Sequence, residues 1–246
     1  FIKGAFSKYV APAIVDSILK DPAKLTVGGE KKELTILFSD IRGFTTMSEK
    51  MQPKQLATFL NDYLGIMTEV VFETKGTLDK YIGDAVMAFW GAPLDQSDHA
   101  SNACEAARTM MRKLAENRER FRQSYSAEVD IGIGINSGAV SVGNMGSDRI
   151  FEYTVIGDHV NLASRLEGLN KYYGTEILAN ADTPCGIILS DLLCLPAGAD
   201  YFPKRCCGVD RYFHRNPHVC EDCVSISRIW QQILIFVRIY SFITGI

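Results

Sequence analysis

Hydrophobic residues recur at helical spacing in several segments of the chain. Apolar positions three and four residues apart fill residues 48–74, 97–122 and 159–174, and this spacing predicts amphipathic helices. Each of the first two segments opens on a serine, Ser48 and Ser97, a residue type that caps helices. A lead-in helix over residues 5–22 is expected to precede them, followed by a turn in the segment TVGGEKK.

Strand-like runs separate these helices. The predicted strand regions are residues 33–40, 77–91, 128–146, 150–157 and 175–180. Residues 77–91 are predicted to form two strands joined at Ile82-Gly83-Asp84, and residues 128–146 two strands joined at Asn136-Ser137-Gly138. The resulting order predicts an α+β fold of ferredoxin-like (βαββαβ) type, with helices packed on an antiparallel-rich sheet.

The periodic pattern fades after Ala181, where the composition also changes. Cys104 is the single cysteine before residue 185, whereas six cysteines follow. We therefore divide the chain into a lead-in helix and linker (1–30), a folded domain (31–181) and a divergent Cys-rich tail (182–246) with no assignable fold. The spacings His214-x₃-His218 and Cys220-x₂-Cys223 resemble zinc-ligand spacing, but non-native, Cys-rich sequence is the simpler interpretation of the tail.

Composition narrows the functional classes. Hydrophobic residues make up 47% and charged residues 22%, which suits a globular protein, and the net charge of −3 gives no reason to expect a nucleic-acid partner. No uncharged apolar run reaches the roughly 18 residues that a spanning helix needs. The chain opens FIKGAFSKYV, without an initiator Met or signal peptide, so we expect a piece of a longer protein.

Two carboxylates are the strongest candidates for chemistry. Asp40 ends the first predicted strand and Asp84 lies in the predicted hairpin, and a ferredoxin-like sheet would place these strands side by side. Taken singly, each Asp could be a structural turn residue. Together they suit Mg²⁺, which binds carboxylates and substrate phosphates. Backbone N–H groups of residues 41–45 could receive a triphosphate, with Gly43 allowing close approach and the helix start at Ser48 adding a favourable dipole.

Four motifs occur in order: FSDIRGFTTMSE, DKYIGDAVMAFWG, GIGINSGAVSVGNMGS and YTVIGDHVNLASRLEGL. Together they resemble the class III nucleotidyl cyclase catalytic domain, of the bacterial adenylate cyclase type, over roughly residues 5–180. The resemblance implies two Mg²⁺ or Mn²⁺ ions per site, bound by Asp40, Asp84 and the Ile41 carbonyl. Within the segment whose N–H groups could receive a triphosphate, Gly43, Phe44 and Thr45 are the expected phosphate-binding residues.

The same resemblance assigns the purine and ribose contacts. Lys80 stands at the purine-reading position, where it can donate to an adenine ring nitrogen, and Thr154 at its partner position can accept from the adenine amino group. Asn161 would orient the ribose, and Arg165 would meet charge developing on the phosphate; they lie one helical turn apart and share a face. Leu162, Leu166 and Leu169 are expected to supply the buried face of this helix. Without the resemblance, Lys80 and Arg165 would be ordinary surface charges and Thr154 an ordinary strand residue.

The implied activity is adenylate cyclase, a phosphorus–oxygen lyase in intracellular signal transduction. The ribose 3′-oxygen of ATP attacks the α-phosphorus with two-metal assistance, giving 3′,5′-cyclic AMP and pyrophosphate. The family site is shared between domains of a head-to-tail pair, so the resemblance implies a homodimer with sites at the interface. It also implies a cytoplasmic catalytic domain behind an upstream sensor or membrane region, one that lies outside this chain.

One departure from the family pattern leaves an alternative open. The family normally continues past TEILAN with a helix and a strand carrying a VKGK-like stretch, whose Lys reaches the triphosphate; no such stretch follows here. The alternative is therefore a weakened or inert cyclase-like module that dimerises or binds nucleotide. Guanylate cyclase activity is disfavoured, because guanylate cyclases carry an acid where this chain has Lys80.

Overall fold

A computed structural model describes residues 14–15, 19, 27–147, 149–180 and 183 of the chain. The predicted lead-in helix and the Cys-rich tail, with its zinc-like spacings, lie largely outside the described residues. Within the described part, no helix combines the length and apolar character needed to cross a membrane.

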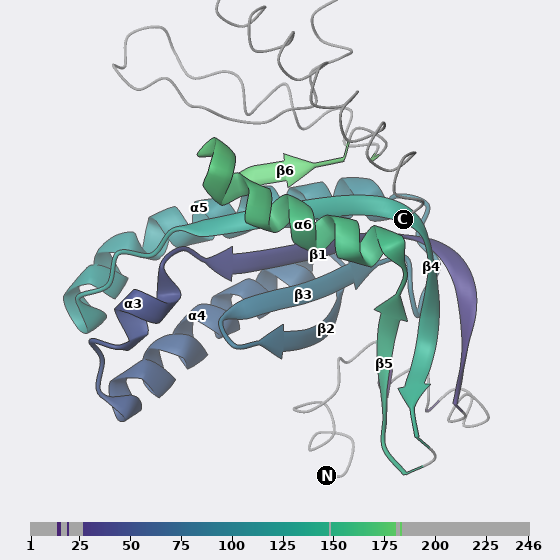
Figure 1. The fold of residues 1–246 in the computed structure, drawn as a ribbon, viewed down its shortest axis with the longest axis horizontal. Helices are drawn as coiled ribbons and strands as arrows, with labels where there is room; N and C mark the ends of the chain where they lie inside the picture. The colour runs from purple at the N-terminus through teal and green to yellow at the C-terminus, as the bar shows by residue number, and fades with distance from the viewer. Residues whose placement is uncertain (1–13, 16–18, 20–26, 148, 181–182, 184–246) are drawn as a thin grey trace, which may run out of the picture. The chain divides into compact units, whose positions relative to one another are not determined.

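A mixed sheet forms the centre of the described domain (Figure 1). Its strands are β1 (Gly28–Ile41), β2 (Thr77–Ile82), β3 (Ala85–Trp90), β4 (Ile131–Gly146), β5 (Phe151–Ile156) and β6 (Ile177–Ala179). The strand order is β2-β3-β1-β4-β5, all antiparallel, and β6 pairs with β4 in parallel. The predicted α+β fold with an antiparallel-rich sheet is confirmed.

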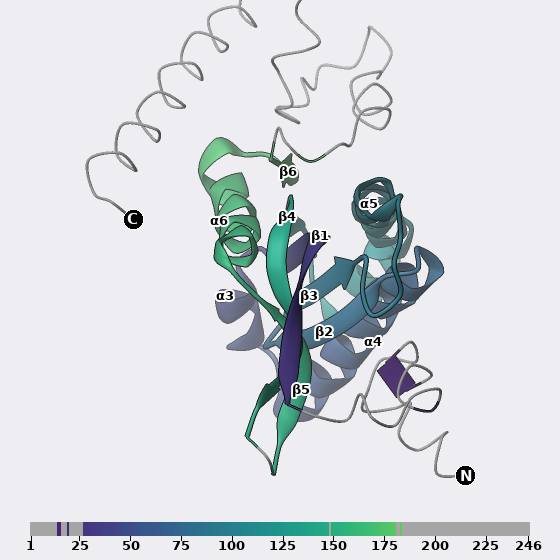
Figure 2. The same ribbon diagram turned by 90° about the vertical axis from the view of Figure 1, so that its right-hand side faces the viewer.

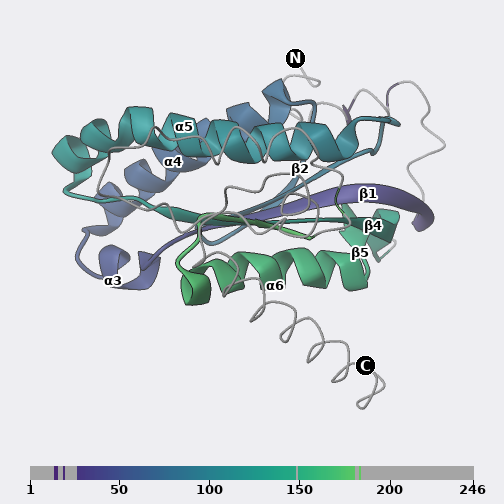
Figure 3. The ribbon, with the colours of Figure 1, turned by 90° about the horizontal axis from the view of Figure 1, so that it is seen from above.

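Helices cover both faces of this sheet (Figures 2 and 3). They are α3 (Phe44–Ser48), α4 (Pro53–Glu73), α5 (His99–Tyr125) and α6 (Asp158–Tyr173). Seen from above, α4 and α5 lie on one side of the sheet and α6 lies on the other. The alternating pattern of β1 explains why both faces are covered: Leu37 and Ile41 join the core under α4 and α5, whereas Leu34 and Ile36 join the core under α6.

Four predicted boundaries are wrong. β1 begins at Gly28, inside the expected turn, and pairs with β4 along its whole length. β4 runs unbroken through Asn136-Ser137-Gly138. Ser48 ends the short helix α3, while α4 begins at Pro53, a residue suited to the first helical position. The cap position of α5 is held by Asp98 rather than Ser97.

Candidate active site

The two predicted metal ligands lie together at one end of the sheet. Asp40 is the penultimate residue of β1, and Asp84 occupies the turn between β2 and β3, where Gly83 takes a left-handed conformation (φ 67°). Because β1 pairs with β3, the turn lies beside the end of β1. The backbone N–H of Ile41 donates a hydrogen bond to Asp84 Oδ2 at 3.1 Å. This bond connects the turn to the strand end that carries Asp40.

The electrostatics of this acidic pair fit a cation. Burial, together with the hydrogen bond and charge of Asp40, raises the pKa of Asp84 to about 7. Two carboxylates this close resist ionising together unless a positive charge compensates them. No cluster of three or more metal-ligating side chains occurs in the described residues. An ion here would therefore complete its coordination with a backbone carbonyl, water and substrate oxygens, as Mg²⁺ commonly does.

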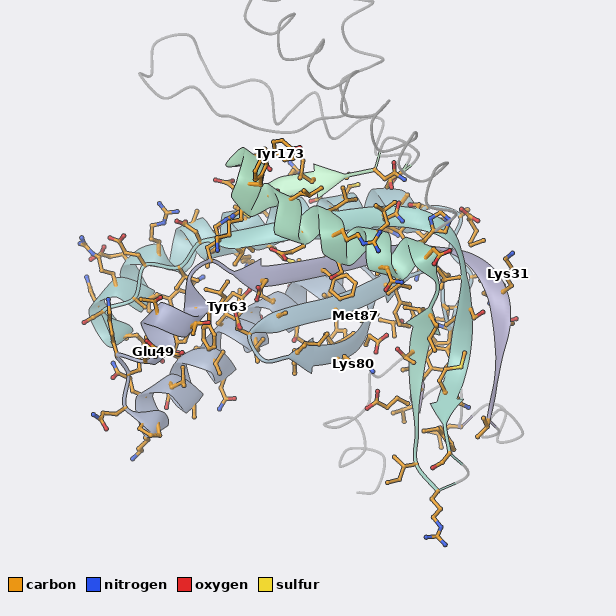
Figure 4. The ribbon with its side chains drawn as sticks, viewed as in Figure 1. Lys31, Glu49, Tyr63, Lys80, Met87 and Tyr173 are labelled. Carbon is orange, nitrogen blue, oxygen red and sulfur yellow. The ribbon has the colours of Figure 1, made fainter. Side chains whose placement is uncertain are left out.

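Tyr63 and Glu167 border the acidic pair and were not predicted. Tyr63 comes from α4 and is completely buried, and its pKa is raised by burial and by the nearby charges of Asp84 and Asp40 (Figure 4). Glu167 comes from α6, and burial and then the charge of Asp40 raise its pKa. Their positions in amphipathic helices gave no sequence signal. The acidic pair is therefore flanked by helices from both sheet faces.

The predicted phosphate cradle opens directly from β1. Gly43 adopts a left-handed conformation (φ 67°, ψ 21°), and α3 begins at the next residue, Phe44. This conformation is one that glycine adopts at little cost. The first N–H groups of a helix have no acceptor within the helix, so those of Phe44 and Thr45 are available by geometry to an anion. The helix that follows Asp40 therefore begins at Phe44, nearer to Asp40 in the sequence than the predicted helix start at Ser48.

The two predicted purine-reading residues lie in a second group that joins β2 to β5. Thr154 Oγ1 donates a hydrogen bond to Asp79 Oδ2 at 2.7 Å. The Lys80 ammonium lies 3.5 Å from Asp79 Oδ1 and forms a short hydrogen-bonded ion pair with Glu152. Although partial burial acts in the opposite direction, the carboxylates of Glu152 and Asp79 raise the pKa of Lys80. Lys80 is labelled in Figure 4.

Asp79 was missed because its position depends on a β-bulge. Leu78 pairs with Ala88 and Lys80 with Met87, so Asp79 is the extra residue in β2. A bulge redirects side chains relative to the regular alternation. The Asp79 side chain is fully buried, and burial raises its pKa, against the opposing effects of Thr154 and Lys80. The sequence offers one signal only, an acid directly before Lys80.

The remaining predicted residues lie on α6. Asn161 and Arg165 are exposed and separated by four positions, which places them on one side of the helix. The buried positions of α6 are Val160, Ala163 and Asn170. The predicted buried role of Leu169 is wrong, since 40% of it is exposed. Its neighbour Asn170 takes the interior position, where its side-chain amide donates to the Ile133 carbonyl at 2.8 Å.

The two groups make separate sets of contacts. Asp40, Ile41 and Asp84 lie where β1 ends and the β2–β3 turn begins, whereas Thr154 lies on β5, beyond the opposite end of the central strands (Figure 1). Lys80, in β2, precedes Asp84 by four residues, but its ammonium pairs with Asp79 and with Glu152 of β5. Among the described residues, no hydrogen bond or ion pair links the two groups. One chain therefore carries an acidic group around Asp40 and Asp84 and a polar group around Lys80 and Thr154.

Comparison with known sequences identifies the class. The sequence pattern of the adenylate and guanylate cyclase catalytic domain matches residues 27–177, which is more than half of the chain. The chain belongs to this family, the class III nucleotidyl cyclases. Domains of this family generally use divalent metal ions.

Individual relatives are consistent with that assignment. Adenylate cyclase 1 of Rhizobium meliloti is 39% identical over 150 residues, covering 61% of this chain and 23% of the relative. Adenylate cyclase of Anabaena cylindrica is 40% identical over 182 residues, covering 72% of this chain and 34% of the relative. The chain thus spans 23% and 34% of the length of these two relatives.

Solved structures share the fold. The adenylyl cyclase CyaB from P. aeruginosa is 40% identical, with a TM-score of 0.56 over 58% of this chain and 74% of that one. The guanylyl cyclase Cya2 is 39% identical, with a TM-score of 0.56 over 58% of this chain and 72% of that one. A bacterial light-regulated adenylyl cyclase gives a TM-score of 0.66 at 27% identity, over 78% of this chain and 54% of that one.

Proposed function

We propose that this chain is an adenylate cyclase domain that converts ATP to 3′,5′-cyclic AMP and pyrophosphate. The observation that carries the proposal is the meeting of Asp40 and Asp84 in a chain of the nucleotidyl cyclase family. In the reaction, the ribose 3′-oxygen forms a bond to the α-phosphorus and loses its proton. The bond from the α-phosphorus to the leaving oxygen breaks, and pyrophosphate departs with the electron pair.

Asp40, Asp84 and the Ile41 carbonyl are the proposed ligands of two Mg²⁺ or Mn²⁺ ions per site. When bound, such ions supply positive charge that activates the 3′-hydroxyl and neutralises the leaving group. The chain's own contribution is to hold both carboxylates at one point, through the Ile41 N–H bond to Asp84. The N–H groups that follow Gly43, at Phe44 and Thr45, are proposed to bind the phosphates.

Lys80 and Thr154 are proposed to select adenine. The ammonium of Lys80 donates to an unprotonated ring nitrogen, which adenine offers at its N1 position and guanine does not. Thr154 accepts from the exocyclic amino group. The two relatives named adenylate cyclase, 39% and 40% identical, support this choice. The similar guanylyl cyclase Cya2 makes GTP the necessary comparison in any assay.

A head-to-tail homodimer is proposed to complete each site. This is supported by the separate sets of contacts that the acidic half-site and the half-site around Lys80 and Thr154 make within one chain. A two-fold pair brings the acidic half-site of one subunit to the polar half-site of its partner and generates two equal sites. Asn161 is proposed to orient the ribose, and Arg165 to stabilise the charge on the reacting phosphate.

The domain assignment and cellular setting are also part of the proposal. Residues 31–181 would form the catalytic domain, residues 1–30 the connection to an upstream sensor or membrane region, and residues 182–246 a divergent tail. The catalytic domain would act in the cytoplasm. Because the chain spans about a third or less of its curated relatives, these assignments concern only this part of the whole protein.

A second candidate, an inert nucleotide-binding module, rests on one observation. No VKGK-like stretch follows Asn180, so the family's triphosphate-binding Lys is missing from its expected place. Incubation of residues 1–246 with Mn²⁺ and either ATP or GTP separates the candidates. The proposal expects cyclic AMP, formed at a rate per chain that rises with protein concentration. Nucleotide binding without cyclic product, in a protein shown to be dimeric, would favour the inert module.

A further inference from the structure

The buried carboxylate of Asp79 fixes the direction of the Thr154 hydroxyl. Thr154 Oγ1 donates to Asp79 Oδ2 at 2.7 Å, a good length for such a bond. A threonine hydroxyl has a single hydrogen and two lone pairs. Once that hydrogen is directed at Asp79, the oxygen can only accept further hydrogen bonds. The contact therefore turns an ambivalent group into an acceptor.

The Lys80 ammonium helps to keep Asp79 in its accepting role. The ammonium lies 3.5 Å from Asp79 Oδ1, an ion-pair distance that favours the ionised, accepting carboxylate. Asp79 thus accepts from the Thr154 hydroxyl at Oδ2 and has a positive charge near Oδ1. Asp79 also occupies the bulge of β2, and its side chain is fully buried, so water cannot readily replace it as the partner of Thr154. The bulge is what directs this side chain from β2 to β5.

The two purine bases differ in the group that would face Thr154. Adenine carries an amino group at C6, a donor, where guanine carries a carbonyl oxygen, an acceptor. A hydroxyl that is free to rotate would serve either base, because it can donate or accept. If the hydroxyl hydrogen already points at Asp79, the Thr154 oxygen can only accept. It then faces the guanine oxygen, which is also an acceptor, and no hydrogen bond forms between them. Thr154 alone is therefore a poor discriminator, whereas Thr154 bound to Asp79 is a selective one.

We propose that Asp79 is a positioning residue that makes Thr154 an obligate acceptor and so favours ATP over GTP. The inference rests on the proposed function, because it takes Thr154 to face the purine. It adds a specificity determinant outside the Lys80–Thr154 pair. It also distinguishes the roles of the two acids around Lys80, since both pair with the Lys80 ammonium but Asp79 also accepts from Thr154.

Asp79→Asn is the direct test, because an amide of the same shape can donate to Thr154 and release the hydroxyl hydrogen. Glu152→Gln is the matched control, since it removes the same charge beside Lys80 but leaves the Thr154–Asp79 bond in place. The readouts are kcat/KM with ATP and GTP, and the calorimetric affinities of 3′-deoxy-ATP and 3′-deoxy-GTP, which cannot cyclise. Melting temperatures establish that each variant is folded.

Asp79→Asn is expected to lower the ATP-over-GTP preference by about tenfold in both readouts, because one hydrogen bond is misdirected. Glu152→Gln should not lower it. Thr154→Val should lower it to a similar extent, and adding Asp79→Asn to that variant should change nothing further. If D79N does not fold, T154V carries the test, since it removes the same hydroxyl.

Three results would overturn the inference. They are an unchanged preference in folded D79N, an equal loss in E152Q, and a further loss when D79N is added to T154V. If the proposed function alone fails, the wild-type chain makes no cyclic AMP but still binds 3′-deoxy-ATP more tightly than 3′-deoxy-GTP. The role of Asp79 is then decided by comparing this affinity ratio between the wild-type chain and the variants. Binding of neither analogue would reject both proposals.

Discussion

The backbone N–H of Ile41 donates a hydrogen bond to the side chain of Asp84 at 3.1 Å. The two residues are 43 positions apart in sequence, yet this bond holds the β2–β3 turn against the end of β1. It explains how two carboxylates remain together although their charges repel. The acidic half-site is therefore a property of the folded chain itself.

Asp84 should reduce stability at neutral pH when no divalent ion is present. Burial and Asp40 raise its pKa to about 7, above the value of about 4 expected in an unfolded chain. The folded chain binds more protons than the unfolded chain between these values, so this carboxyl's contribution to stability falls as pH rises through that range. Asp84→Asn, measured in EDTA, should raise the melting temperature by about 2 °C at pH 8 and by less at pH 5.

Asp95→Asn is a suitable control for that measurement. Asp95 accepts a hydrogen bond from Lys32 at 2.7 Å, so removing its charge should not stabilise the fold at either pH. A melting temperature for Asp84→Asn that is unchanged or lower at pH 8 would contradict the account of the acidic pair.

Divalent ions should stabilise the folded chain through the same two residues. At a Mn²⁺ concentration about 100 times the dissociation constant, linkage adds about 2.7 kcal/mol to the free energy of unfolding. We expect thermal scans of the wild-type chain to shift upward by several degrees with Mn²⁺, and scans of Asp40→Asn to shift little. An equal Mn²⁺ effect in both proteins would place the ion elsewhere.

The position of α6 depends on a glycine in β4. A Cβ at Gly134 would lie 2.2 Å from the Ala163 carbonyl oxygen and 2.3 Å from the Glu167 amide nitrogen, both backbone atoms of α6. Gly134→Ala should therefore displace the helix that carries Arg165, at a cost of about 3 kcal/mol in the free energy of unfolding. Urea denaturation measures this cost.

The matched glycine variant is Gly65→Ala in α4. Gly65 is exposed, and a Cβ there meets nothing within 4 Å, so the substitution should stabilise the helix by about 0.5–1 kcal/mol. Similar effects at the two glycines would show that α6 does not pack on β4 as closely as described.

Glu152 should compete with the nucleotide for Lys80. The Lys80 ammonium is paired with Glu152 at the surface, where 66% of the Glu152 side chain is exposed. The interaction free energy of such a surface ion pair is at most about 1 kcal/mol, because solvent screens the charges. Glu152→Gln should therefore lower KM for ATP by up to about fivefold and leave kcat unchanged. A raised KM in steady-state kinetics would show that Glu152 helps to position Lys80 instead.

Local patterns predicted most of the fold and the acidic pair, but they could not predict contacts made across the sheet. Residues 136–138 resemble a turn, yet β4 continues because other elements satisfy their polar groups. Asn136 donates to the His159 carbonyl at 2.9 Å, and Ser137 shares a 2.7 Å hydrogen bond with Thr35. Asp79 was missed for the same reason, since its role arises from a bulge and from strand β5.

The central claim, that each active site is shared by two subunits, has a direct test. Asp40→Ala and Arg165→Ala chains with different tags can be co-expressed, and the heterodimer isolated by two affinity steps. Each homodimer should lose activity about 100-fold or more. The heterodimer carries one intact site and should recover about half of the wild-type rate of cyclic AMP formation. A stable heterodimer as inactive as either homodimer would contradict the account.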